Sequence, residues 1–183
     1  TDPAIYQEAT GTWQAWLSGS GYAVVMASGL GGPGSVPVPE DYDGDFKADP
    51  AVYEAATGTW KAMLSGSGYA TTVLGAGWGG PAFTQVARDY DGDYKADPAV
   101  YRPEGGTWYG WITTSGYGQV WCADWGGPSW VAVSANYDGD ARVDPAIYEQ
   151  ATGSWRVWQS GSGYVPVDRT GWGGPGFLPV MPY

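Results

Sequence analysis

One unit is repeated four times along the chain. The motif Asp-Pro-Ala-Val/Ile-Tyr recurs at intervals of 47, 48 and 47 residues, starting at Asp2, Asp49, Asp97 and Asp144. A tryptophan after Gly-Thr/Ser, a tyrosine after Ser-Gly and a Gly-Gly-Pro tripeptide keep the same interval. The tryptophans are Trp13, Trp60, Trp108 and Trp155, and the tyrosines are Tyr22, Tyr69, Tyr117 and Tyr164. Because the copies fill all 183 residues, the fold must be built from four like units.

Each unit is expected to contain four short β-strands. The first strand is predicted at 36–42, 85–90, 131–137 and 178–183, and the second over the Pro-Ala-Val/Ile-Tyr segment. In the second repeat the third and fourth strands are predicted at Thr59–Leu64 and 69–74. Trp, Tyr, Val and Thr dominate these segments, and Gly-Ser-Gly or Thr-Gly separates them. Since no segment shows a 3.6-residue apolar period, the sequence predicts an all-β protein almost without helix.

A four-stranded unit of about 47 residues has the size of one β-propeller blade. The chain begins at a second strand and ends after a first strand, so residues 1–34 are completed by 176–183. The other blades are predicted at 35–81, 82–128 and 129–175, all within one domain, 1–183. Pairing of the terminal strands would close the ring and remove its free edges. An eight-bladed ring made by two chains that exchange strands, and an open solenoid, are the alternatives.

Aspartates gather in the loop between the first two strands of a unit. Positions 1, 3, 5 and 9 of each loop carry oxygen ligands, and the carbonyl at position 7 can join them. The sets are Asp41, Asp43, Asp45, Lys47 and Asp49; Asp89, Asp91, Asp93, Lys95 and Asp97; and Asn136, Asp138, Asp140, Arg142 and Asp144. Such oxygens suit Ca²⁺, which takes 6–8 of them. The alternative is an Asp-Gly turn whose carboxylates bind only backbone amides.

The pattern Asp-Tyr-Asp-Gly-Asp-x-Lys-x-Asp-Pro-Ala-Val-Tyr, with Gly-Thr-Trp after it and Trp-Gly-Gly before it, resembles the FG-GAP/VCBS repeat family of integrin-α-like β-propellers. The resemblance covers essentially the whole chain. It implies a propeller with calcium held in the loop between the first two strands of a blade. The chain departs from the family at loop position 6, where Phe46, Tyr94 and Ala141 replace the usual Gly. Asn136 and Pro182 also stand where the first Asp of a loop is expected.

The tryptophans form two groups. We expect Trp13, Trp60, Trp108 and Trp155 to pack between blades, because large flat side chains fill the space between sheets. Trp78, Trp125 and Trp172 lie in Gly-rich loops. They are candidate platforms for stacking against sugar rings, or else they close over the edge of their own blade.

Composition restricts the function. The chain has no His and one Cys, which excludes a Ser-His-Asp triad, a histidine-ligated metal, an internal disulfide and a cluster of several cysteines. A net charge of −11 argues against nucleic acid as partner, and we expect no membrane insertion. We therefore expect a non-catalytic, calcium-binding recognition or scaffold module, outside the cell or at its surface, for an unknown protein or glycan. A homodimer through strand exchange is a further expectation. A glycan-binding lectin and, less favoured, a glycoside hydrolase with paired carboxylates are the alternative functions.

Overall fold

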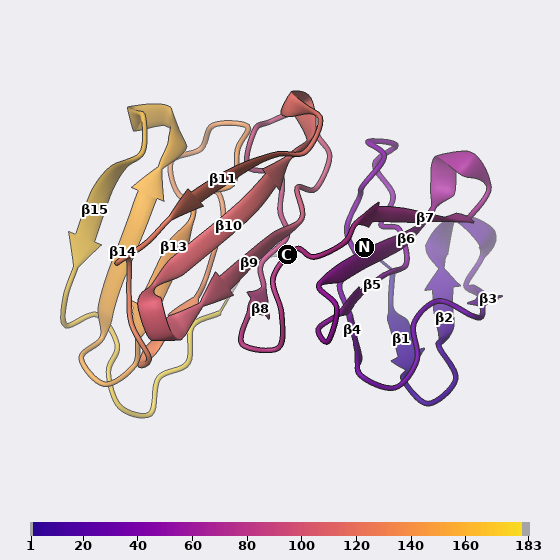
Figure 1. The fold of residues 1–183 in the computed structure, drawn as a ribbon, viewed down its shortest axis with the longest axis horizontal. Helices are drawn as coiled ribbons and strands as arrows, with labels where there is room; N and C mark the ends of the chain where they lie inside the picture. Colours follow the sequence, from indigo (N-terminus) through magenta and orange to yellow (C-terminus); the bar gives the residue numbers. More distant parts are fainter. Residues whose placement is uncertain (1, 181–183) are drawn as a thin grey trace. The chain divides into compact units, whose positions relative to one another are not determined.

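The computed structural model describes residues 2–180. Within them the chain forms four antiparallel sheets whose strands follow one another in sequence order (Figure 1). The sheets contain β1 (Ala4–Gln7), β2 (Thr12–Leu17) and β3 (Ala23–Ala27); β4 (Ser35–Pro37), β5 (Ala51–Glu54), β6 (Thr59–Leu64) and β7 (Ala70–Gly75); β8 (Thr84–Gln85), β9 (Ala99–Arg102), β10 (Thr107–Ile112) and β11 (Gly118–Cys122); and β12 (Trp130–Ala132), β13 (Ala146–Glu149), β14 (Ser154–Gln159) and β15 (Val165–Arg169). The predicted all-β class is confirmed, and so are blade-like four-stranded sheets in three of the four repeats.

The helical segments in the described residues are single 3₁₀ turns. They are η1 (Ser18–Ser20), η2 (Ser65–Ser67), η3 (Pro103–Gly105), η4 (Thr113–Ser115) and η5 (Ser160–Ser162). The chain divides into two compact units, one up to Ala82 and one from Phe83 onward. Each unit holds two of the sheets, and the division falls next to the predicted repeat boundary at 81/82.

A tyrosine and a tryptophan on adjacent strands form the same pair in every sheet. In the second sheet Tyr53 on β5 is the register partner of Trp60 on β6, and their rings lie 4.9 Å apart. The equivalent pairs are Tyr6–Trp13, Tyr101–Trp108 and Tyr148–Trp155, with ring separations of 4.9, 4.9 and 4.7 Å. Tilted aromatic pairs of this kind add about 0.5–1.5 kcal/mol beyond the area they bury. The strongest sequence landmarks are therefore cross-strand contacts.

The apolar cores lie between neighbouring sheets of the same unit. In the first unit Trp13 and Leu30 from the first repeat pack with Val52 from the second. In the second unit Trp108 and Trp125 pack with Ile147 from the fourth repeat. The predicted packing of this tryptophan between sheets is thus confirmed in the first repeat, at Trp13, and in the third, at Trp108. In the fourth repeat Trp155 packs against a cluster from its own sheet.

The first strand of the second, third and fourth repeats is shorter than predicted. In the second repeat β4 ends at Pro37, and pairing continues only as a Val38 N–H bond to the Ala51 carbonyl and an isolated bridge between Glu40 and Asp49. The hydroxyl of Tyr42 donates to the Val38 carbonyl at 2.8 Å, a bond that competes with continuation of the ladder. Equivalent tyrosine bonds and bridges occur in the next two repeats, at Tyr90 and Val86, Tyr137 and Val133, Arg88 and Asp97, and Ala135 and Asp144.

The fourth strand starts one residue later than predicted because Tyr69 belongs to the preceding turn. Gly68 and Tyr69 both adopt left-handed backbone angles, with φ of +71° and +64°. Their N–H groups bond to the carbonyls of Ser65 and Leu64 at 3.2 and 2.9 Å, which closes the loop between β6 and β7. The third strand, Thr59–Leu64, agrees with the prediction.

Ring closure is not confirmed. In the described residues β1 pairs only with β2, so the first sheet has three strands. Of the closing strand predicted at 178–183, residues 178–180 form no strand, and 181–183, including Pro182, lie outside the described residues.

In three of the four Gly-Gly-Pro tripeptides the first glycine is required by its backbone and by a tyrosine. Gly173 has φ of +104°, and a Cβ atom there would lie 2.6 Å from the Tyr148 hydroxyl. That hydroxyl accepts the N–H of Gly174 at 3.1 Å. In the earlier repeats a Cβ at Gly31 or Gly126 would likewise clash with a tyrosine hydroxyl. These glycines allow the loop to close over the Tyr–Trp pair.

We predict that Gly173→Ala lowers the free energy of unfolding by about 2 kcal/mol or more, because it adds left-handed strain to a clash. Gly19→Ala is the matched control. A Cβ there meets nothing within 4 Å and the residue has no left-handed φ, so stability should stay equal or rise slightly. Urea denaturation measures both variants. Equal stability of the two would contradict the role given to Gly173.

Candidate metal centre

The loop at 41–49 is held in shape by its own aspartates. Asp41 accepts the N–H groups of Gly44 and Phe46, both at 2.6 Å, one on each carboxylate oxygen. Gly44 and Phe46 have φ of +83° and +65°, so the chain turns sharply twice. Asp89 binds Gly92 and Tyr94 in the same way in the next repeat. The first aspartate therefore acts as the internal brace of the loop.

The last aspartate joins the loop to a neighbouring turn. Asp49 has no exposed surface, accepts the N–H of Tyr42 at 2.9 Å, and accepts the N–H of Ser65 in η2 at 2.7 Å. Asp97 and Asp144 are equally buried and bind the equivalent amides, those of Tyr90 and Thr113 and of Tyr137 and Ser160. A buried carboxylate without such donors would cost several kcal/mol.

Burial raises the pKa of two carboxyl groups, those of Asp49 and Asp97. Desolvation raises the pKa of Asp49, and the nearby Asp43 and Asp41 charges add to the increase. Desolvation raises the pKa of Asp97 to about 6, although two backbone amides act in the opposite direction. A carboxylate held close to like charges in a low dielectric is stabilised by a bound cation.

Two loops bring three carboxylates together. Ligand oxygens of Asp41, Asp43 and Asp49 all lie within 4.8 Å of one another, and so do those of Asp89, Asp91 and Asp97. In the first loop Asp43 Oδ2 accepts the N–H of Gly66, while Asp43 Oδ1 is buried and has no hydrogen-bond partner within residues 2–180. A buried carboxylate oxygen without a donor is the type of atom that a metal ion satisfies.

The fifth-position aspartate is not part of these groups. Asp45 accepts the Lys47 N–H at 3.0 Å, the Lys47 ammonium at 2.8 Å and the Ser65 hydroxyl at 2.7 Å. Hydrogen bonding with Lys47 is the main cause that lowers the pKa of Asp45. Asp93 similarly binds the Lys95 N–H and the Thr113 hydroxyl. The structure thus brings together three of the four carboxylates predicted for each loop.

The third loop differs because its first residue is an amide. Asn136 Oδ1 accepts the N–H of Gly139 as Asp41 does for Gly44, but its Nδ2 donates to the Asp140 carbonyl. An amide nitrogen cannot accept the N–H of residue 141, and Ala141 is not left-handed as Phe46 and Tyr94 are. Asp138 and Asp140 bind Gly161 and Ser160, and Arg142 reaches from this loop to the Asp91 carbonyl.

Sequence reasoning missed the residues that face the loop from the 3₁₀ turn. Ser65, Thr113 and Ser160 each donate a hydroxyl to the fifth-position aspartate and an N–H to the ninth. Their signal was present, because a Ser or Thr occurs 16 residues after the ninth-position aspartate in each of the three repeats. These residues form the second side of the candidate metal centre.

The donors fit a hard cation. All three side chains in each group are carboxylates, the loop carries no sulfur or imidazole, and mixed carboxylate and carbonyl oxygens are the set that calcium accepts. Asp41, Asp43 and Asp49 would hold an ion in the first loop, and Asp89, Asp91 and Asp97 in the second. The ion would supply positive charge that crosslinks the loop to the 3₁₀ turn.

The loop tryptophans occupy three different environments. Trp125 is 4% exposed and lies between Trp108 and Trp158, with ring centroids 5.6 and 4.3 Å away. Trp78 is half-buried, and its ring lies where a Cβ of Gly75 would be. Trp172 is 65% exposed, and its carbonyl accepts the Trp155 indole N–H at 2.9 Å. Sugar stacking stays a prediction, and Trp172 offers the most exposed ring of the three.

No family model, characterised protein or solved structure matches the chain. None of the helical segments among residues 2–180 is long and apolar enough to cross a membrane.

The left-handed aromatic residues in the first two loops provide a stability test. Phe46 and Tyr94 are exposed, and their left-handed φ angles of +65° and +69° are strained for a non-glycine residue. Phe46→Gly and Tyr94→Gly should each raise the free energy of unfolding by roughly 0.5–1 kcal/mol, after allowing for the entropy of glycine in the unfolded chain. Ala141→Gly, at the equivalent position without left-handed φ, should lower it by a similar amount. Thermal melts of the three variants without calcium give the comparison, and a uniform shift in one direction would refute it.

Proposed function

We propose that the chain is a calcium-stabilised β-propeller module that binds a partner and performs no chemistry. The observation that carries the proposal is that three carboxylates meet in each of two loops. The groups are Asp41, Asp43 and Asp49, and Asp89, Asp91 and Asp97, and the ligand oxygens within each group lie within 4.8 Å of one another. They recur at the same place in successive repeats, and their last member is fully buried in both. Structural calcium explains why a turn would keep three mutually repelling charges at this distance.

Calcium would act by stabilising the folded chain. The loop and the 3₁₀ turn of the same repeat meet at the candidate centre, where Ser65 and Gly66 donate N–H groups to Asp49 and Asp43. An ion bound only by the folded state adds about 2.7 kcal/mol per site at a concentration 100 times its dissociation constant. Extracellular calcium modules typically bind in the range of about 10⁻⁴–10⁻³ M, and a location outside the cell or at its surface, which is part of this proposal, would require no tighter binding.

Chelation tests the metal assignment. With two sites saturated, we predict that excess EDTA lowers the melting temperature by roughly 10–20 °C, since about 1 kcal/mol corresponds to roughly 2–4 °C at this size. Asp43→Asn and Asp91→Asn should each remove about half of this shift. Asp138→Asn, at the same position of the third loop, should change it least. A melting curve that is the same with EDTA and with calcium would overturn the proposal.

The closed ring is part of the same proposal. Three four-stranded sheets and one three-stranded sheet leave β1 without the outer strand that β4, β8 and β12 supply elsewhere. In the sequence repeat, residues 178–183 correspond to the first strand, which is the strand that this sheet lacks. Strand addition from the same chain gives a four-bladed ring, and exchange between two chains gives an eight-bladed dimer.

Sedimentation equilibrium separates these two forms of closure. A mass near 19.3 kDa supports the four-bladed ring and twice that mass supports the exchanged dimer. Deletion of 178–183 should destabilise either form. If the truncated chain keeps the mass and the melting temperature of the full chain, strand closure by these residues is wrong.

A further inference from the structure

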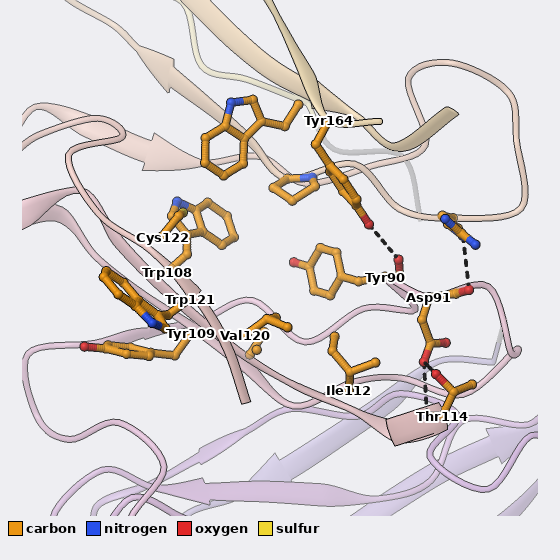
Figure 2. A pocket seen from close by; sticks show the side chains of 15 residues that line it. Tyr90, Asp91, Trp108, Tyr109, Ile112, Thr114, Val120, Trp121, Cys122 and Tyr164 are labelled. Atoms are coloured by element: carbon orange, nitrogen blue, oxygen red, sulfur yellow. Dashed lines mark hydrogen bonds between the residues drawn. The ribbon is translucent and has the colours of Figure 1, made fainter. Parts of the chain in front are cut away.

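A pocket of about 420 Å³ opens between the third and fourth sheets of the second unit (Figure 2). Its volume lies within the range of small-molecule sites, and most of its lining is apolar or aromatic, as in such sites. The lining includes Trp108, Gly110, Trp121, Cys122, Trp158 and Tyr164. None belongs to the Trp-Gly-Gly loops that the sequence suggested as ligand platforms.

Flat rings form the walls of this pocket at one end. Trp158 stacks on the buried Trp125 with ring centroids 4.3 Å apart and an interplanar angle of 20°, which fixes its orientation. Trp108 is 6% exposed and belongs to the same core. Trp121, which also lines the pocket, leaves 67% of its surface in solvent. An exposed apolar surface beside a rigid aromatic wall is favourable to cover.

The charged groups gather at the other end. In Figure 2 Asp91 and Thr114 lie away from Trp121 and Tyr109. Asp91 Oδ2 accepts the Thr114 hydroxyl at 2.6 Å, and Arg142 Nε donates to the Asp91 carbonyl at 3.1 Å. Asp91 and Arg142 therefore already have hydrogen-bond partners within the protein. At the aromatic end, burial raises the pKa of the Cys122 thiol to about 11, so this group is neutral at physiological pH.

A glycine in the middle of β10 makes room for the pocket. Gly110 is buried and its position carries Ala15, Ala62 and Val157 in the other repeats. A Cβ at Gly110 would meet the Val120 side chain at 3.4 Å and nothing closer. Neither left-handed backbone nor a clash therefore demands a glycine here. Glycine weakens a strand, and an unforced one often marks a place where another molecule approaches closely.

We propose that this pocket binds a small uncharged aromatic molecule of one or two fused rings, packed against the Trp108 and Trp158 rings over Gly110. Offset stacking on such walls adds about 0.5–1.5 kcal/mol per ring pair beyond buried area. A sugar would leave several of its hydroxyl groups without partners at the apolar end, which costs free energy for each group. A ring with one polar substituent needs one hydrogen bond, and the hydroxyl groups of Thr114 and Tyr164 lie on the polar side. The inference does not depend on calcium binding.

Titration with 5-fluoroindole, followed by ¹⁹F NMR, tests the proposal on the full chain. We expect saturable binding to the wild type and intermolecular contacts, seen as NOEs, to the methyl groups of Ile112 and Val120. Methyl β-glucoside should not displace the probe. Absence of binding, or binding without these NOEs, would overturn the proposal without the need for a variant.

Two variants test the pocket itself. Gly110→Val, which introduces the residue found at 157, should weaken binding at least 10-fold because it fills the space over the strand. Ala15→Val, the same kind of enlargement at the equivalent position of the first unit, should leave binding unchanged. Trp158→Met, which introduces the residue found at Met63, should weaken binding by removing one wall. Wild-type affinity in a folded Gly110→Val variant would refute the site.

Discussion

In the second, third and fourth repeats, a buried carboxylate before the Pro-Ala-Val/Ile-Tyr strand holds the rest of the repeat in place. Asp49, Asp97 and Asp144 have no exposed surface, and each accepts one N–H from the preceding loop and one from the 3₁₀ turn after the third strand. The loop, the strand and the turn are thereby fixed to one another. Because such a charge is costly to bury, the donors around it must keep their places, and the same local structure recurs in every repeat that contains it.

Much of the fold could be predicted because the same residues recur at the same positions in four copies of one sequence unit. A residue that recurs every 47 or 48 positions is expected to make the same local contact in each repeat. The cross-strand contact between Tyr53 and Trp60 is an example. Strand Thr59–Leu64 followed from its β-forming residues and the turn signals beside it. The aspartate spacing predicted that positions 1, 3, 5 and 9 meet, and positions 1, 3 and 9 come together in the first two loops.

The rest depended on competition between groups that sequence spacing does not reveal. Asp45 is drawn to Lys47 and Ser65, so it leaves the carboxylate group. Tyr42 donates its hydroxyl to Val38 at the point where β4 was expected to continue. Trp125 was predicted in a Gly-rich loop, either as a sugar platform or closed over the edge of its own blade, and it is enclosed by Trp108 and by Trp158 of the neighbouring sheet. In each case a side-chain contact that the repeat spacing does not reveal decides the outcome.

We propose that the carboxylate groups at 41, 43 and 49 and at 89, 91 and 97 are calcium sites. A crystal grown in calcium, with anomalous scattering measured to locate the ions, is the decisive test. If both loops bind calcium, each should show one anomalous peak coordinated by the three carboxylates, with a weaker peak or none beside Asn136, where an amide replaces a charged ligand. Electron density with only water or direct hydrogen bonds among the three carboxylates of both loops would contradict it.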